Sequence, residues 1–79
     1  MKTITLDNLD TALLENMARY ETILIDNQYK IKRYMDGWRV RCKWFEIGSD
    51  FDWEEDNHLG ELRYSADGAI EAVYEWVGK

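Results

Sequence analysis

The sequence predicts a small α+β domain with two layers, in which two helices pack on an antiparallel sheet of three to four strands. Three observations predict this class. Apolar residues recur at helical spacing near each end of the chain, the central region alternates in the manner of strands, and a two-residue turn signal divides that region. The expected element order is α-β-β-β-(β)-α in a single domain, residues 1–79, because the chain contains no linker-like segment.

The first helix is expected over residues 8–20, with Asp7 or Thr5 as its N-terminal cap. Its apolar stripe is formed by Leu6, Leu9, Leu13, Met17 and Tyr20. The alternation that precedes it, residues 3–6, fits either a short strand or the approach to the helix.

Three strands are expected over residues 21–25, 29–35 and 38–47. A three-residue loop at 26–28 places Ile25 opposite Tyr29 and Glu21 opposite Arg33, so that the Glu21 carboxylate would neutralise Arg33. The pair Asp36-Gly37 is a hairpin signal because both residues tolerate positive φ. That turn places Ile31 opposite Cys42.

The second face of this hairpin is basic. The expected register pairs Lys32 with Arg41 and Lys30 with Lys43, with Tyr34 opposite Arg39. Like charges directly opposite each other destabilise a sheet, so this ladder needs an anion. The acidic segment that follows and an external acidic ligand are both candidates, and the net charge of −6 favours the acidic segment.

A short fourth strand is expected over residues 61–65, followed by a helix over 68–77. Asp67 or Ser65 is the predicted cap of this helix. Its predicted core stripe contains Ile70, Val73 and Val77, with Trp76 on the flank.

The segment 46–61 carries seven carboxylates and no Lys or Arg. Carboxylates spaced along a strand and loop imitate the phosphates of a nucleic acid, which predicts binding to a basic protein surface. The candidate partner-binding residues are Asp50, Asp52, Trp53, Glu54, Glu55, Asp56 and Glu61. The segment also aligns with a calcium loop, but Glu55 stands where that loop needs glycine, so we expect no metal site.

Composition excludes several classes of function. A net charge of −6 argues against a direct nucleic-acid partner. No apolar run approaches the ~20 residues that span a membrane. The single cysteine, Cys42, is expected to be a buried thiol in a reducing cytoplasm. The single histidine, His58, has no metal-ligand or nucleophile partner near it in sequence, so we expect neither catalysis nor a cofactor.

The acidic, aromatic-containing run 50–56, within a small α+β plan, resembles the small acidic type I anti-CRISPR proteins that phages encode. The resemblance implies a stoichiometric inhibitor, a monomer or weak dimer in the host cytoplasm. Such an inhibitor binds a subunit of a CRISPR effector complex as a nucleic-acid mimic and blocks its DNA-binding surface. A second interpretation remains open: a structural or regulatory phage-type interaction domain, whose charge serves solubility and internal pairing.

Overall fold

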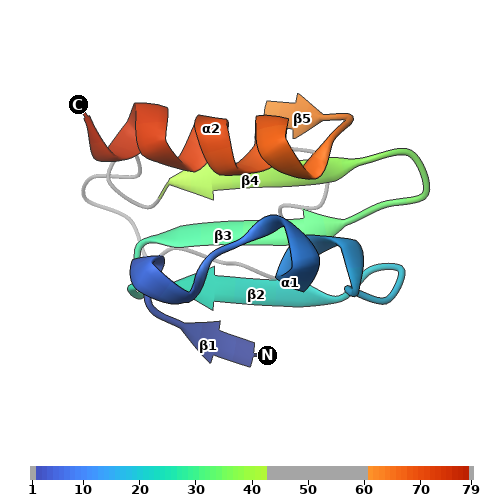
Figure 1. The fold of residues 1–79 in the computed structure, drawn as a ribbon, viewed down its shortest axis with the longest axis horizontal. Helices are drawn as coiled ribbons and strands as arrows, with labels where there is room; N and C mark the ends of the chain where they lie inside the picture. The colour runs from blue at the N-terminus through green and yellow to red at the C-terminus, as the bar shows by residue number, and fades with distance from the viewer. Residues whose placement is uncertain (1, 43–60, 79) are drawn as a thin grey trace, which may run out of the picture.

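The computed structural model describes residues 2–42 and 61–78, and these form the predicted α+β fold. The element order is β-η-α-β-β-β-β-α (Figure 1). The elements are β1 (Lys2–Ile4), the 3-10 helix η1 (Leu6–Asn8), α1 (Thr11–Glu15), β2 (Thr22–Ile25), β3 (Tyr29–Arg33), β4 (Trp38–Cys42), β5 (Glu61–Arg63) and α2 (Ala66–Val77).

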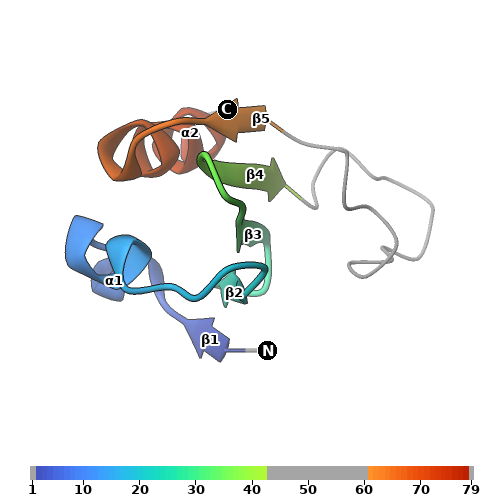
Figure 2. The same cartoon turned by 90° about the vertical axis from the view of Figure 1, so that its right-hand side faces the viewer.

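Among the described residues the sheet has five strands in the order β1-β2-β3-β4-β5, and it is mixed instead of antiparallel as predicted. The strand added to the predicted three to four is β1, which pairs parallel to β2. The pairs β2–β3, β3–β4 and β4–β5 are antiparallel. The Asp26 backbone N–H donates to the Ile4 carbonyl at 3.0 Å and so extends this pairing beyond the strand. Both helices lie on one side of the strands, which gives the predicted two layers (Figure 2).

The predicted first helix, residues 8–20, was too long. Asp10 caps α1, because its side chain accepts the Leu13 N–H at 2.8 Å, and neither Asp7 nor Thr5 takes that role. Helical structure ends at Glu15, and a turn follows in which the Glu21 N–H donates to the Ala18 carbonyl at 3.0 Å. The short α1 still buries Leu14, as an amphipathic helix should.

The register of the first hairpin is confirmed, with Ile25 opposite Tyr29. The register of the second was wrong by two residues, because Ile31 lies opposite Val40 instead of Cys42. The Tyr34 N–H donates to the Gly37 carbonyl at 2.7 Å, so the turn is centred one residue earlier than predicted. A shift by two residues leaves every side chain on its predicted face.

Ser65, one of the two predicted caps, begins α2, since its Oγ accepts the Gly68 N–H at 3.0 Å. The predicted stripe was partly wrong. Val73 is buried, but Val77 is 43% exposed. The fully or largely buried positions are Ala66, Ala69, Ala72 and Val73. Small side chains there allow the helix backbone to approach β4 and β5 closely.

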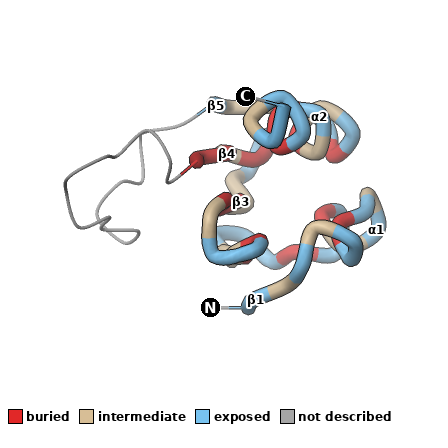
Figure 3. Tube along the Cα trace, turned by 90° about the vertical axis from the view of Figure 1, so that its left-hand side faces the viewer, coloured by how far each residue is buried: buried red, intermediate tan, exposed pale blue. Residues whose placement is uncertain are grey.

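The core lies between the helices and the sheet, with buried stretches along β3, β4 and α2 (Figure 3). Cys42 is buried there, as predicted. Trp38 Nε1 and Arg33 Nη1 both donate to the Leu14 carbonyl, at 3.2 and 3.0 Å, and so tie α1 to the sheet. Glu21 does not neutralise Arg33 as predicted, because its Oε1 accepts the Ala18 N–H while the Arg33 guanidinium lies 4.2 Å from the Trp38 ring centroid.

Candidate functional site

Most of the predicted partner-binding residues lie outside the residues that the structure describes. These are Asp50, Asp52, Trp53, Glu54, Glu55 and Asp56. Glu61 is the described member, and its exposed side chain on β5 is engaged within the chain. Its Oε1 accepts from both Nε and Nη2 of Arg63, and Nη2 also donates to Glu75 Oε2 at 3.0 Å.

Arg63 therefore links β5 to α2. Its Nη1 also donates to the Gly68 carbonyl at 3.4 Å. The hydrogen bond to Glu61 is the main reason that the pKa of the Arg63 guanidinium lies above its ordinary value. Glu61 thus has a structural role at this junction, which the sequence-based prediction did not include.

The basic ladder exists, with different partners. Lys30 lies opposite Arg41, and Lys32 lies opposite Arg39. By strand alternation these four side chains occupy the face away from the core residue Ile31. Lys30 and Arg41 are only 5% and 7% exposed. None of the four is without an interaction partner, so the ladder is not a set of free cations.

Tyr20 and Tyr34 lie next to Lys32 and Arg39 of this ladder. The rings of Tyr20 and Tyr34 meet edge to face with centroids 5.8 Å apart. Lys32 Nζ lies 6.0 Å from the Tyr20 centroid and 5.8 Å from that of Tyr34, while Arg39 Cζ lies 5.5 Å from the Tyr34 centroid. Burial raises the pKa of the Tyr34 phenol, and the charge of Arg39 partly opposes this increase.

Tyr20 has an unusual backbone. It is the third residue of the turn from Ala18 to Glu21, with φ 67°. That position of a turn normally takes glycine or asparagine, because a left-handed conformation costs an ordinary residue about 1–2 kcal/mol. The other two non-glycine residues with positive φ in the described part of the chain, Asp26 and Asn27, are types that tolerate it.

The exposed side chains of Tyr20, Met35 and Tyr64 and the half-buried Tyr34 lie at this end of the sheet. The backbone bonds Tyr20 N–H to Arg33 carbonyl and Tyr34 N–H to Gly37 carbonyl continue the ladders past the strand ends. The register of β4 with β5 places Tyr64 beside Gly37. We call Tyr20, Tyr34, Met35 and Tyr64 the aromatic rim. The sequence-based prediction placed Tyr34 on the basic face of the hairpin and did not connect it with the other three.

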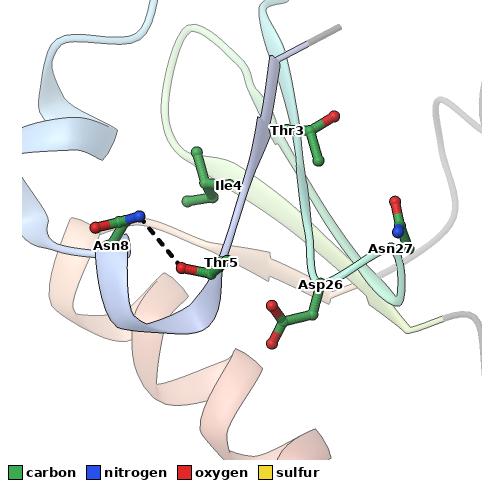
Figure 4. Close-up of a pocket in the computed structure, with 6 residues that line it drawn as sticks. All are labelled: Thr3, Ile4, Thr5, Asn8, Asp26 and Asn27. Carbon is green, nitrogen blue, oxygen red and sulfur yellow. Dashed lines mark hydrogen bonds between the residues drawn. The ribbon is translucent and has the colours of Figure 1, made fainter.

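A shallow pocket of about 470 Å³ lies at the opposite end of the sheet, where β1 meets the β2–β3 turn (Figure 4). It is lined by Thr3, Ile4, Thr5, Asn8, Asp26 and Asn27. Asn8 Nδ2 donates to Thr5 Oγ1 at 3.2 Å, and Asp26 Oδ1 accepts the Leu6 N–H at 3.3 Å. These hydrogen bonds fix the conformation of the chain between β1 and α1, so the polar side chains that line the pocket support the fold.

Five exposed carboxylates make no hydrogen bond or ion pair with another described residue. We call these the free carboxylates: Asp7, Glu15, Asp36, Asp67 and Glu71. Asp67 and Glu71 are four residues apart on α2, and like charges at this spacing repel slightly. The described surface therefore presents negative charge while its basic ladder is engaged.

Within residues 2–42 and 61–78 there is no group of three or more His, Cys, Asp or Glu side chains suited to a metal ion. The calcium-loop alignment lies outside this part of the chain, except for Glu61. The described helices include none that is long and apolar enough to cross a membrane. No protein-family model, curated protein or solved structure matches the chain.

Proposed function

We propose that the protein is a non-catalytic inhibitor that binds a basic protein surface through its carboxylates. The observation that carries this proposal is the division of charge. The free carboxylates are exposed without partners among the described residues and add to the long-range attraction, whereas the cations of the basic ladder are engaged. With a net charge of −6, the protein is attracted to a basic surface over roughly the Debye length of 8–10 Å.

The segment 46–61 supplies the densest charge and is the proposed contact. Its carboxylates would occupy the positions of nucleic-acid phosphates in the partner's groove, with Trp53 as an apolar anchor. By the resemblance to anti-CRISPR proteins, that groove belongs to a CRISPR effector in the cytoplasm of a host cell. Binding in this groove would block DNA binding by the effector without a chemical reaction and without a cofactor.

The test is a pulldown of purified type I CRISPR surveillance complexes with three forms of the chain, which are wild type and two charge-reversal variants, and with a buffer-matched blank. The segment variant carries Lys at Asp52, Glu54, Glu55 and Asp56. The matched control carries Lys at Asp7, Glu15, Asp67 and Glu71, with the same change in net charge. We expect the segment variant to lose binding and the control to keep most of it.

Equal loss in both variants would show that overall charge, and not the segment, controls binding. Full binding by the segment variant would overturn the proposed contact. If wild type binds no surveillance complex, the target implied by the resemblance is wrong.

A second function is favoured by the Arg63 junction. Glu61 and Glu75 both serve an internal bridge between β5 and α2, so some of the acidity supports the fold itself. A structural or regulatory interaction domain would need no basic partner. Such a domain is expected to retain its interactions when salt is raised from 50 to 500 mM, whereas an electrostatic inhibitor is not.

A further inference from the structure

We propose that the aromatic rim is a docking surface that anchors the partner protein by stacking on its arginine side chains. This inference rests on the proposed function and gives it a second contact. Carboxylates mainly accelerate association and select the partner, whereas buried aromatic side chains supply most of the affinity in protein interfaces. A tight inhibitor therefore needs an apolar anchor as well as its acidic segment.

The rim is large for a protein of this size. Tyr20, Met35 and Tyr64 are 56%, 72% and 71% exposed. With about 200 Å² for each such side chain, they leave about 400 Å² of largely apolar area in water. A patch of roughly 300–600 Å² is the largest that typical monomers carry, and such patches are often functional.

These side chains come together through the sheet register. Tyr20 precedes β2, Tyr34 and Met35 follow β3, and Tyr64 follows β5. Figure 1 shows the turn before β2, the β3–β4 connection and the end of β5 at the right-hand end of the sheet. Because neighbouring strands carry them, the rim residues form one row instead of isolated exposed positions.

Tyr20 argues against a purely structural explanation of the row. A bulky residue with φ 67° is strained, and a ring that is 56% exposed recovers only part of that energy through its contacts with Tyr34 and Lys32. Asn at this position would relieve strain without disturbing the turn. Strain kept at an exposed aromatic residue is typical of a functional position.

The rings are also held in place before any partner arrives. Tyr20 packs against Tyr34, and the ammonium of Lys32 lies about 6 Å from both centroids. A preorganised ring loses less rotamer freedom when it binds than a free one.

The chemistry at the tip of the β3–β4 connection favours arginine. Asp36 follows Met35, is exposed, and belongs to the free carboxylates. A guanidinium can pair with its carboxylate while its flat face lies on Tyr64 and its methylenes lie on Met35. Three cations would repel a further cation at Tyr20 and Tyr34. Arg19 is exposed and precedes Tyr20, while Lys32 and Arg39 lie within about 6 Å of these rings. We therefore place the arginine contact at Met35, Asp36 and Tyr64, with Tyr20 covering the apolar flank.

The first test compares two variants for binding to a type I CRISPR surveillance complex by biolayer interferometry. The rim variant combines Tyr20→Asn, Met35→Gln and Tyr64→Gln. The control combines Tyr74→Gln and Val77→Gln, which are exposed apolar residues on α2. We expect the rim variant to bind at least tenfold more weakly through faster dissociation, and the control to stay within twofold of wild type. A rim variant that binds like wild type overturns the proposal, even if the acidic segment proves essential.

The second test does not depend on the CRISPR target. A tri-arginine peptide is titrated into ¹⁵N-labelled protein, with tri-lysine as the comparison. We expect saturable shifts at Met35, Asp36 and Tyr64, at a midpoint at least threefold lower for tri-arginine. Shifts of equal midpoint at the rim and at Glu71 on α2 would mean general charge attraction and would overturn the rim assignment. If gel filtration instead shows that the rim variant abolishes a dimer, the occupant is a second copy of the chain and the arginine assignment is wrong.

Discussion

Replacement of Gly37 by Ala tests how β5 is held against the β3–β4 connection. An added Cβ would lie 2.2 Å from the Arg63 carbonyl oxygen and 3.3 Å from the Tyr64 Cα. An ordinary contact needs more than 3.4 Å at such an atom pair, so backbone must move by about 1 Å. The Arg63 backbone cannot rotate away as the tip of a side chain can, so the movement disturbs the three-residue pairing of β4 with β5.

We expect the substitution to lower the free energy of unfolding by about 2–4 kcal/mol. Overpacking alone costs about 1–3 kcal/mol, and each ladder hydrogen bond that lengthens contributes about 1 kcal/mol more. A domain of this length has a total stability of roughly 4–12 kcal/mol, so the loss is a large share of it. At about 4–8 °C per kcal/mol, Tm should fall by about 10 °C or more.

Urea unfolding followed by tryptophan fluorescence measures this loss, and Gly78→Ala is the matched control. The nearest atom to a Cβ at Gly78 is the Tyr74 carbonyl oxygen at 3.5 Å, an ordinary contact. The control should therefore stay within about 0.5 kcal/mol of wild type or gain slightly by reducing unfolded-chain entropy. If Gly37→Ala unfolds at the same urea concentration as the control, β5 does not pack on Gly37 as described.

Substitutions at three further positions address a helix cap, the core and the ionisation of buried tyrosines. Ser65→Ala removes the acceptor of the Gly68 N–H and should cost about 1 kcal/mol in urea unfolding, while Ser65→Asp should restore most of it. Ala69→Leu places a larger side chain at a position with no exposed surface and should cost about 1–3 kcal/mol in a thermal melt; an unchanged Tm would mean a looser contact of α2 with the sheet. Burial is the main cause of the raised pKa of Tyr29 and Tyr34, so the folded state loses their phenolic protons later than the unfolded chain. The resulting stability is complete below about pH 10 and is lost as pH rises through the folded-state pKa, so Tyr34→Phe should lose less stability than wild type as the pH is raised above about 10.

Local signals predicted the first hairpin but not the second. Asp26 and Asn27 adopt positive φ in the β2–β3 turn, as their side chains allow, and the register followed from that loop. In the second hairpin Gly37 was placed inside the turn because glycine tolerates positive φ. Its actual requirement is close contact with the Arg63 backbone, 26 residues further along the chain. No local pattern reports such a contact, so the register moved by two residues.

The first helix was misjudged for a similar reason. Thr5, Asp7 and Asp10 are all good caps, and local preference does not choose between them. The pairing of β1 with β2 keeps the chain extended as far as Ile4, and Leu6–Asn8 form a separate 3-10 helix that ends at the extended Leu9. Asp10 is therefore the cap of α1. The presence of the basic ladder was predicted correctly, although its residue pairs were not, because alternation alone sets the face of each strand residue.

The two candidate surfaces differ in how far a sequence can reveal them. The acidic segment is contiguous, so its charge is visible from composition alone. The aromatic rim combines residues from three separate stretches of chain, and only strand register joins them. Tyr20 bears on both the misjudged helix and the aromatic rim. Its helical spacing extended the predicted helix too far, because no glycine or asparagine marks the turn in which it lies. A turn that keeps tyrosine where local preference asks for glycine needs a reason elsewhere, and the aromatic rim that Tyr20 shares with Tyr34 and Tyr64 supplies one.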